Sequence, residues 1–344
     1  AASAGAPVAD NPSPGGLAGR EVVVHFTDRA FGSTPESAAE AFTAWVGDAA
    51  SVQVVLHDVP QASDGTGQER RAAAYTRVVR ASDRVVVSSE HERELLAAAT
   101  GLDADRITVV PLPVERSAAT PDGVEQDAQA LARLSHASEK GDRRALAPIL
   151  PARLGPGPAG LPPGRWVATL GFAYPGKGLE EVVDATAAAA RDPRLPEAAR
   201  PMGVLNLGGA APGHEDLLTE LEERAAATGT QFVATGWLDD AALAAACHRV
   251  AVPVAYHRHV SASGSVNSWL AAGRRPVVVR ARYTDEQSER MPGSMALVDH
   301  TEDLAPLVGA IVTALGDPAS TQQDETVALW PSWEQAAAML RAAR

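Results

Sequence analysis

Short apolar runs alternate with longer amphipathic segments along most of the chain, and this alternation predicts strands and helices in turn. The runs expected to be strands are 21–26, 51–56, 84–88, 106–113, 166–171, 204–209, 231–237, 250–256, 276–279 and 295–298. Helices are expected from Thr34, over 69–81, from Ser89, over 179–190, 214–228, 239–247, just before Gly273, over 301–315 and at the end of the chain. Strands alternating with helices at this spacing are typical of βαβ units and parallel sheets.

The alternation breaks at residues 116–165, which are polar at first and then rich in proline and glycine. One helix is expected near 124–135, and the rest is predicted to be a linker or insertion. The sequence therefore predicts an α/β protein with two Rossmann-like domains, over 21–115 and 166–325, followed by a helical segment over 326–344. A length of 344 residues also favours two domains over one.

Composition narrows the possible partners and compartment. A net charge of −13 argues against nucleic acid or an anionic membrane as the main partner, and no apolar run is long enough for a transmembrane segment. The single cysteine, Cys247, excludes an intrachain disulfide framework and favours a reducing, cytoplasmic location. Residues 1–20 lack signal-peptide features and are expected to be a disordered lead-in or the tail of a longer polypeptide. High alanine, arginine and glycine content favours a bacterial source.

The segment after the strand at 250–256 combines a turn of small hydroxylated residues with the start of a short helix. The turn is Ser261-Ala262-Ser263-Gly264-Ser265, and Arg258 and His259 precede it. A helix N-terminus leaves backbone N–H groups free to hold an anion, and ligands of α/β sheets bind at the carboxyl ends of strands. These features favour a phosphate site. An ordinary βα connection with a serine cap would explain the same residues.

Five segments in order resemble the retaining family 4 glycosyltransferases of the GT-B fold. They are His57-Asp58, 83–89 followed by 107–113, Gly171 to Gly178, 235–240 and 331–334. The resemblance covers about residues 21–115 and 166–344. It implies that two Rossmann-like domains face each other across a cleft, with the acceptor on the first and the nucleotide-sugar donor on the second. It also implies that the last helix crosses back to the first domain.

Lys177 is the strongest single candidate for catalysis. It is one of two lysines, and it lies between glycines in a loop before a helix. The departing diphosphate needs a cation, which Lys177 would supply. The resemblance implies that the turn residues Ser261, Ser263, Gly264 and Ser265 hold the same diphosphate. A solvated surface lysine is the alternative interpretation.

Two departures from the family pattern stand out. The family pairs its lysine with an arginine five or six residues earlier, where this chain has Phe172 and Gly171. The family also has two carboxylates eight positions apart, which fall here near Val260 and Ser268. Asn267 or Ser268 would then hold the donor ribose through neutral hydrogen bonds, and Arg258, Arg274 or Arg275 would replace the missing positive charge.

Further candidates follow other strands. His57 is expected beside the reacting carbon with Asp58 as its neighbour, although a strand-end histidine bonded to backbone is equally consistent with the sequence. Gly236 and Trp237 are expected beside the nucleotide base, although packing in the core would explain Trp237 equally well. Asp28 and Arg29 are expected on the acceptor side, although an ordinary loop would explain them equally well. The pair His257 and His259 lacks the further ligands of a metal site, so no metal is expected.

The sequence thus predicts a metal-independent, retaining glycosyltransferase of hexosyltransferase type that needs no cofactor beyond its donor. That donor would be a nucleotide-diphosphate sugar, with UDP and GDP both open, and the acceptor is unidentified. Two alternatives remain open at this point. One is a non-catalytic GT-B module of a larger polypeptide, and the other is a nucleotide-sugar epimerase.

Overall fold

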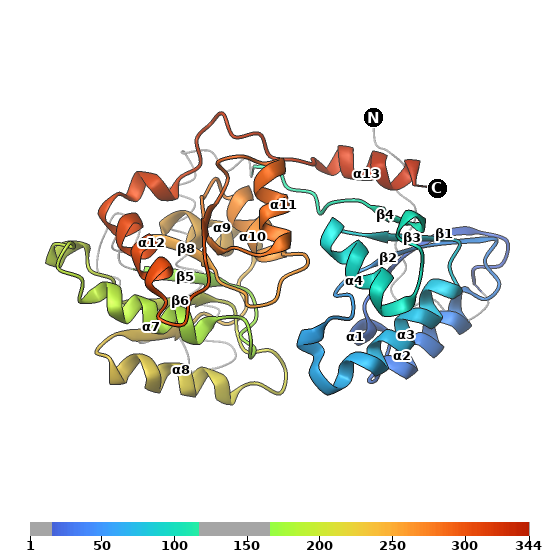
Figure 1. The fold of residues 1–344 in the computed structure, drawn as a ribbon, viewed down its shortest axis with the longest axis horizontal. Coiled ribbons are helices and arrows are strands. Elements are labelled where there is room, and N and C mark those ends of the chain that lie inside the picture. The colour runs from blue at the N-terminus through green and yellow to red at the C-terminus, as the bar shows by residue number, and fades with distance from the viewer. Residues whose placement is uncertain (1–15, 117–165, 344) are drawn as a thin grey trace. The chain divides into compact units, whose positions relative to one another are not determined.

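The computed structural model describes residues 16–116 and 166–343, which fall into two compact units (Figure 1). The first unit ends at Leu112 and also includes the chain from Trp333 onward, and the second unit is Pro113–Ser332. Most of the predicted lead-in (1–20), and nearly all of the predicted linker (116–165) with its helix near 124–135, lie outside the described residues.

The first unit is built on a four-stranded parallel sheet in the order β1-β2-β3-β4. Its strands are β1 (Glu21–Phe26), β2 (Ser51–Leu56), β3 (Arg84–Val87) and β4 (Ile107–Val109). Its helices are α1 (Asp28–Phe31), α2 (Pro35–Val46), α3 (Gln68–Arg80), α4 (Glu90–Thr100) and α13 (Trp333–Ala342), with 3-10 turns at Ala62–Gly67 and Ala104–Arg106. Each strand continues to its neighbour through a helix, which keeps all pairs parallel.

The core of the first unit lies between the sheet and helices α2, α3 and α4. Phe26, Phe42 and Tyr75 are fully buried there, with ring centroids 5.3 Å apart in edge-to-face contacts. The opposite face of the sheet carries α13, because Gln53 Nε2 donates to the Leu340 carbonyl at 3.1 Å. The last helix therefore packs as part of the first unit, far in sequence from its other elements (Figure 1).

The second unit has a six-stranded parallel sheet in the order β10-β9-β8-β5-β6-β7. Its strands are β5 (Trp166–Leu170), β6 (Gly203–Leu207), β7 (Gln231–Ala234), β8 (Val252–Ala255), β9 (Val277–Val279) and β10 (Ala296–Val298). Its helices are α7 (Leu179–Ala190), α8 (Asp216–Ala227), α9 (Asp240–Arg249), α10 (Gly264–Ala271), α11 (Arg282–Arg290) and α12 (Ala305–Gly316), with 3-10 turns at Glu197–Ala199 and Pro318–Thr321. One apolar core includes side chains of α7, α8 and α12, while α9 and α10 contribute to separate clusters.

The strand order of the second sheet reverses between β5 and β8. The chain builds outward from β5 through β6 and β7, then returns to the other side of β5 with β8, β9 and β10. In open α/β sheets the loops leaving the two strands at such a reversal diverge and leave a crevice at the carboxyl edge. The loops after β5 and β8 occupy this position, and they contain Lys177 and the Ser261–Ser265 turn.

The predicted fold class, two Rossmann-like α/β domains, is confirmed. Some elements differ from the sequence prediction. Helix α11 was not predicted, because its sequence is almost entirely polar and shows little apolar spacing. The strands expected over 106–113 and 231–237 are shorter, since the chain turns away from the sheet after Val109 and Ala234.

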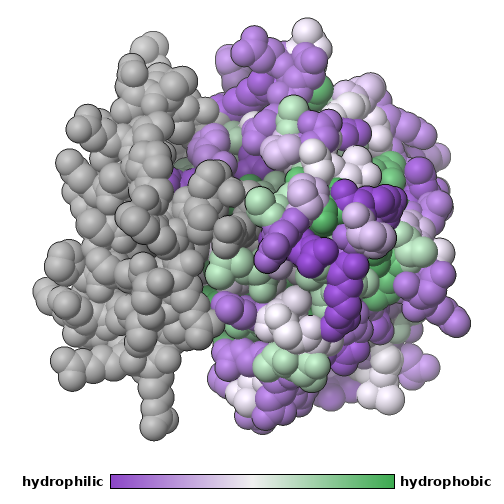
Figure 2. Space-filling view, turned by 90° about the vertical axis from the view of Figure 1, so that its left-hand side faces the viewer, coloured by the Kyte–Doolittle hydropathy of each residue, from purple (hydrophilic) through white to green (hydrophobic). Residues whose placement is uncertain are grey.

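None of the helices in the described ranges is long and apolar enough to cross a membrane. On the face shown in Figure 2, hydrophilic residues predominate and hydrophobic ones are scattered among them.

Candidate functional site

The loop after β5 is folded against the end of β8 in the second unit. The backbone N–H of Arg258 donates to the Gly176 carbonyl at 3.2 Å. Gly178 has φ +78°, and a Cβ added there would lie 1.8 Å from the Tyr256 carbonyl oxygen. Only glycine allows this approach, since it combines a positive φ with the absence of a side chain. The glycines around Lys177 therefore bring the lysine to the carboxyl edge of the sheet.

Lys177 belongs to this loop and is buried, with 5% of its surface exposed. Its Nζ donates to the Phe172 carbonyl at 2.6 Å and lies 5.7 Å from the centre of the Tyr174 ring. Within residues 16–116 and 166–343, no carboxylate lies within ion-pair distance of this ammonium. Burial without a counter-ion lowers the pKa of Lys177 from 10.5 to about 7. An uncompensated cation of this kind is suited to receive an anionic ligand.

His257 interacts with both candidates for the diphosphate seat: electrostatically with Lys177, and through a contact with the Ser261–Ser265 turn. Burial, and to a smaller extent the Lys177 ammonium, lowers the pKa of His257 to about 4, so this imidazole is neutral near pH 7. His257 Nε2 makes a long contact of 3.5 Å to Ser265 Oγ, which lies 3.1 Å from Ser263 Oγ. The structure therefore brings together the two candidates for the diphosphate seat.

A short helix was predicted before Gly273, and in the structure Ser263 is the N-cap residue of this helix, α10. Its hydroxyl accepts the Val266 N–H at 3.2 Å, and its own N–H donates to the Tyr283 hydroxyl of α11 at 3.1 Å. Within the described parts of the chain, the N–H groups of Gly264 and Ser265 donate to no other group. Two donors at a helix N-terminus therefore remain for an anion.

The other residues predicted to bind the sugar donor differ in exposure and in their partners. Arg258 is half-exposed and its guanidinium pairs with Glu181, a buried carboxylate of α7. His259 is exposed, Ser261 is buried, and Asn267 is buried with its Nδ2 3.4 Å from the Pro113 carbonyl. Arg258 is therefore already neutralised, so it supplies less positive charge than the sequence suggested.

Arg274 does not supply the missing charge at all. It is 1% exposed, and its guanidinium donates to the carbonyls of Cys247, His248, Ala251 and Thr321 and to the Thr321 hydroxyl. Its neighbour Arg275 also donates to carbonyls, those of Gly293 and Ser320. These two arginines fasten loops of the second unit together.

Sequence reasoning missed Asn206, which ties together the loops at the carboxyl edge. Asn206 is fully buried; its Oδ1 accepts the Thr169 hydroxyl at 2.8 Å, and its Nδ2 donates to the Gly171 and Gly208 carbonyls. The next loop joins them, because Gly208 N–H donates to Thr235 Oγ1 at 3.0 Å. A polar residue inside an otherwise apolar strand was the available signal.

The loop after β7 contains Gly236 and Trp237, the two residues expected beside the nucleotide base. Gly236 has φ +71°, and Trp237 is 85% exposed. Phe172 and Tyr174 of the β5 loop are also exposed aromatic residues of this unit. Core packing, the alternative interpretation for Trp237, is therefore wrong, whereas its role beside a base stays a prediction.

The first unit places His57 and Asp58 in a tight turn after β2. Asp58 has φ +54°, a left-handed conformation that is uncommon for residues other than glycine. The Tyr75 hydroxyl lies 3.0 Å from the His57 carbonyl and 3.2 Å from that of Asp58. Arg71 also donates to the Asp58 carbonyl. Two side chains of helix α3, Arg71 and Tyr75, therefore fix the backbone of this turn through hydrogen bonds to its carbonyls.

Arg71 is the centre of a cluster of three aspartates. Its side chain is 11% exposed and pairs with Asp28 at 2.9 Å, Asp64 at 2.8 Å and Asp58 at 3.3 Å. Asp28, predicted on the acceptor side, is buried and committed to this cluster, whereas its neighbour Arg29 is exposed. The carboxylates raise the pKa of Arg71 despite its burial.

His25, at the end of β1, contacts His57. The His25 Nδ1 and His57 Nε2 atoms are 2.9 Å apart, and the rings are nearly parallel with centroids 5.3 Å apart. Burial lowers the pKa of both imidazoles, and His25 lowers that of His57 further. Sequence reasoning did not include His25, Arg71 or Tyr75.

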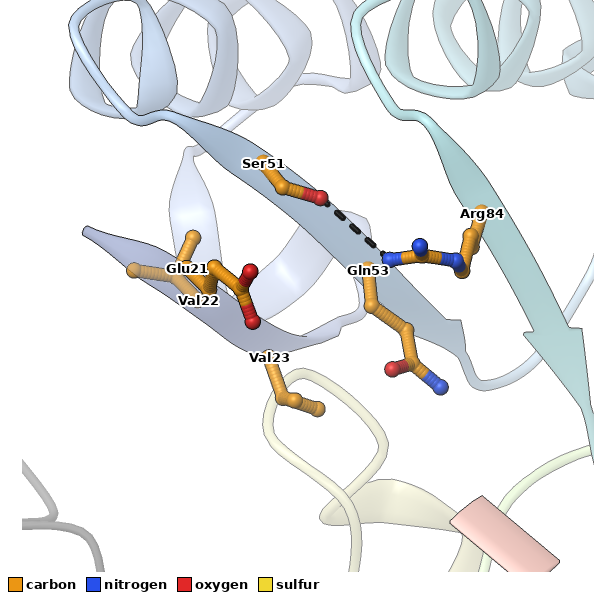
Figure 3. Close-up of a pocket in the computed structure, with 6 residues that line it drawn as sticks. All are labelled: Glu21, Val22, Val23, Ser51, Gln53 and Arg84. Carbon is orange, nitrogen blue, oxygen red and sulfur yellow. Dashed lines mark hydrogen bonds between the residues drawn. The ribbon is translucent and has the colours of Figure 1, made fainter. Parts of the chain in front are cut away.

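A small, open pocket lies at the opposite edge of the first sheet (Figure 3). Glu21, Ser51 and Arg84, the first residues of β1, β2 and β3, line it, and Arg84 donates to the Ser51 hydroxyl at 3.3 Å. It is at the amino ends of the strands, away from His57. Across the described ranges, no group of three or more His, Cys, Asp or Glu residues is arranged to hold a metal ion.

Comparisons with known proteins agree with this architecture. Residues 16–113 match the family model described as a glycosyl transferase 4-like domain. Comparison with curated proteins gives no match. HepE of Anabaena in complex with UDP aligns with a TM-score of 0.58 and 15% identity, over 93% of this chain and 73% of HepE. For HepE in complex with UDP-glucose the TM-score is 0.59 with 13% identity, over 93% and 77% of the two chains.

An α,α-trehalose-phosphate synthase (UDP-forming) from Burkholderia xenovorans aligns with a TM-score of 0.54 and 15% identity, over 94% of this chain and 70% of the synthase. At these identities the structural likeness establishes the fold. The chain has the GT-B fold of two Rossmann-like domains. The match of residues 16–113 to a glycosyl transferase 4-like domain agrees with the family that the sequence resembles.

Proposed function

We propose that this protein is a glycosyltransferase that moves a hexosyl group from a nucleotide-diphosphate sugar to an acceptor. Transfer proceeds with retention of anomeric configuration and without a metal ion. The second unit binds the donor, and the first unit supplies the acceptor side through the His57–Asp58 turn. The matched glycosyl transferase 4-like domain and the GT-B fold support this class of reaction.

The observation that carries the proposal is the uncompensated ammonium of Lys177 at the reversal of the second sheet. Bringing this group out of water without a counter-ion is unfavourable, as its lowered pKa indicates. Protein surfaces offer many places where a lysine would be solvated instead. A buried cation beside two free N–H groups of α10 gains a partner when a diphosphate binds.

The same groups would then act on the leaving diphosphate. Negative charge grows on the diphosphate oxygen as the bond to the sugar breaks, and a preorganised cation stabilises that charge without first reorganising water. Gly264 and Ser265 would contribute their N–H groups, and the Ser263 and Ser265 hydroxyls lie beside them. The diphosphate oxygen would in turn accept the proton of the acceptor hydroxyl.

The test compares nucleotide binding and sugar transfer in Lys177→Met and Lys177→Arg. HepE is known as UDP and UDP-glucose complexes, so UDP is the first probe, with GDP and ADP alongside. We expect Lys177→Met to lose about 100-fold or more in transfer rate, the loss typical of removing one stabilising group. Lys177→Arg keeps the charge and should retain part of the affinity.

The matched control is Arg258→Met, which removes a nearby cation that Glu181 already neutralises. It should change UDP affinity much less than Lys177→Met. Near-normal transfer by a folded Lys177→Met variant would overturn the proposal. Release of UDP from a UDP-sugar only when acceptor is added would separate transfer from epimerisation, and absence of nucleotide binding would indicate a non-catalytic module.

Proton uptake offers a second test of the same site. In the empty protein the pKa of Lys177 is about 7, so above neutral pH the group is mostly uncharged. A bound diphosphate favours the charged form and raises this pKa, so binding above neutral pH should take up a proton at Lys177. Calorimetry of UDP binding in two buffers of different ionisation enthalpy measures this uptake. Lys177→Arg, which is always charged, should show less uptake.

A further inference from the structure

The contact between His25 and His57 fixes where protons lie on the two rings. In the parallel pairing of β1 and β2, His25 is opposite Val55, and His57 is two residues farther along on the same face of the sheet. Their facing nitrogens, His25 Nδ1 and His57 Nε2, are 2.9 Å apart, a hydrogen-bonding distance. Two N–H groups cannot face each other at this separation, and two lone pairs repel. One proton must therefore lie between the rings.

Two arrangements satisfy this condition. In the first, His57 carries its proton on Nε2 and donates it to His25 Nδ1. In the second, His25 carries its proton on Nδ1 and donates it to His57 Nε2. The Nε2–H form is the intrinsically more stable tautomer of a neutral histidine side chain. The first arrangement keeps both rings in that form, whereas the second requires the less stable form on both.

The surroundings of His57 leave its other nitrogen available. In the ranges 16–116 and 166–343, Nδ1 of His57 and Nε2 of His25 contact no hydrogen-bonding group. The backbone of His57 is fixed, because its N–H donates to the Phe26 carbonyl at 2.9 Å and its carbonyl accepts from Tyr75. The remaining question is whether Nδ1 of His57 accepts or donates a hydrogen bond when a substrate binds.

We infer that His25 is a positioning residue whose Nδ1 accepts a hydrogen bond from His57 Nε2–H and so makes His57 Nδ1 a hydrogen-bond acceptor for a sugar hydroxyl. The inference rests on the proposed function for the substrate class. The proton arrangement itself is a property of the protein alone. In this role His25 does not touch the substrate, and it determines which substrate groups His57 can bind.

The first experiment requires no substrate. Two-bond proton–nitrogen correlation spectra of the full chain with 15N-labelled histidine distinguish protonated from bare ring nitrogens. His25→Gln and His57→Gln variants assign the two residues. Above neutral pH we expect a single Nε2–H tautomer for both rings. An Nδ1–H form or a mixture of tautomers at His57 would overturn the inference.

Two substitutions at His25 then separate the hydrogen bond from the packing of the ring. His25→Phe keeps a flat ring but has no nitrogen, so His57 should become a mixture of tautomers. His25→Asn offers a carboxamide oxygen near the position of Nδ1, so His57 should stay in its Nε2–H form. Unchanged signals of the remaining histidines would show that each variant is folded. A His57 tautomer that is insensitive to His25→Phe would contradict the assignment.

A metal ion between the two nitrogens is the competing explanation of their short separation. Addition of a chelator should leave both sets of signals unchanged if a proton joins the rings. Loss or displacement of both sets on chelation would overturn the inference in favour of a bound metal.

The functional test uses the same variants. His25→Phe should lower kcat by about tenfold, the effect of one lost hydrogen bond, while UDP affinity at the Lys177 site stays unchanged. His25→Asn should recover most of the rate. Equal rates for His25→Phe and wild type would contradict the positioning role. If wild-type protein transfers no sugar, the proposed function fails, whereas the tautomer result is decided independently by the spectra.

Discussion

The two units use different chemistry at the carboxyl edges of their sheets. In the second unit the candidate site consists of loop backbone, hydroxyl groups and one buried ammonium without a counter-ion. In the first unit it consists of paired side chains, with one guanidinium surrounded by three carboxylates and one imidazole against another. The strand orders differ as well, since only the second sheet reverses its order among the described strands.

This difference shows how each unit sets up a binding edge. A reversal in strand order opens a crevice between diverging loops, so backbone groups can converge on a ligand there. The described strands of the first sheet follow chain order from β1 to β4, and its site residues are instead fixed by side chains of α3. The second unit therefore gathers backbone N–H groups and a buried ammonium at this edge, whereas the first holds an arginine, aspartates and two imidazoles in paired contacts.

The largest effect is expected from removing the cation of the first unit. Arg71→Met leaves Asp28 and Asp64 without their partner, and unpaired buried carboxylates cost about 3 kcal/mol of unfolding free energy. Hydrogen exchange measured by mass spectrometry should show the loss in peptides of α3, with the second unit unaffected. Arg70→Met is the control, because its pair with Glu36 is exposed and worth less than about 1 kcal/mol. Similar losses in both variants would contradict the cluster.

The second unit should respond in the opposite direction. The folded-state pKa of Lys177 is about 7 against 10.5 in the unfolded chain, so the unfolded state binds the proton more tightly. Below the folded-state value the penalty is fully present, and it is relieved as pH rises from about 7 toward 10.5. A pKa lowered from 10.5 to about 7 costs the folded state about 4 kcal/mol at neutral pH. Lys177→Met also removes the hydrogen bond to the Phe172 carbonyl, which is worth about 2 kcal/mol because its donor is charged. The variant should therefore stabilise the second unit by about 2 kcal/mol near neutral pH and lose that gain at pH 10. Thermal unfolding at both pH values measures this. Destabilisation at neutral pH would contradict the lowered pKa.

A smaller effect isolates the backbone strain at Asp58. Because this residue has φ +54°, Asp58→Gly should be about 1 kcal/mol more stable than Asp58→Ala, although both remove the carboxylate. Denaturant unfolding of the first unit gives the difference. Equal stabilities would mean that the turn relaxes out of the left-handed region once the carboxylate is gone.

The smallest effect on stability is expected at Trp237. Its side chain is 85% exposed, so Trp237→Ala should change the unfolding free energy by less than about 0.5 kcal/mol. If the indole stacks on the nucleotide base, UDP affinity should fall by roughly tenfold. Trp333→Ala, an exposed tryptophan of the first unit, is the matched control and should leave UDP affinity unchanged. Equal affinities of the two variants would remove Trp237 from the donor site.

Local sequence signals were sufficient for much of the fold. The helix starts at Thr34 and Ser89 were predicted at hydroxyl-bearing residues, and each side chain accepts a backbone N–H three residues on. Helix α11 was missed because only three of its residues, Tyr283, Thr284 and Gln287, are buried. Its importance for the candidate site is not local, since Tyr283 bonds to the N–H of Ser263 from the next βα unit.

Candidate-site residues that directly follow a strand were predicted, whereas residues inside a strand or a helix, such as His25, Asn206 and Arg71, were missed. Lys177 and the serine turn lie in loops that leave β5 and β8. Arg71 lies in the first turn of α3, a helix with several arginines. One signal does distinguish it: Arg71 is four residues before buried Tyr75 and so shares its face of the helix. Two of its partners, Asp58 and Asp64, lie in the connection between β2 and α3, and Asp28 begins α1, so no pattern along the sequence connects all three.

The carboxamide of Asn206 has a consequence for engineering this protein. The Asn206 side chain donates to the carbonyls of both Gly171 and Gly208. The conformations of the loops after β5 and β6 therefore depend on each other. Contact is so close that a Cβ added at Gly208 would lie 2.3 Å from the Gly171 carbonyl oxygen. Exchanging either loop alone for that of a relative would leave the other without its support. Chimeras intended to change donor preference should transplant both loops together with Asn206.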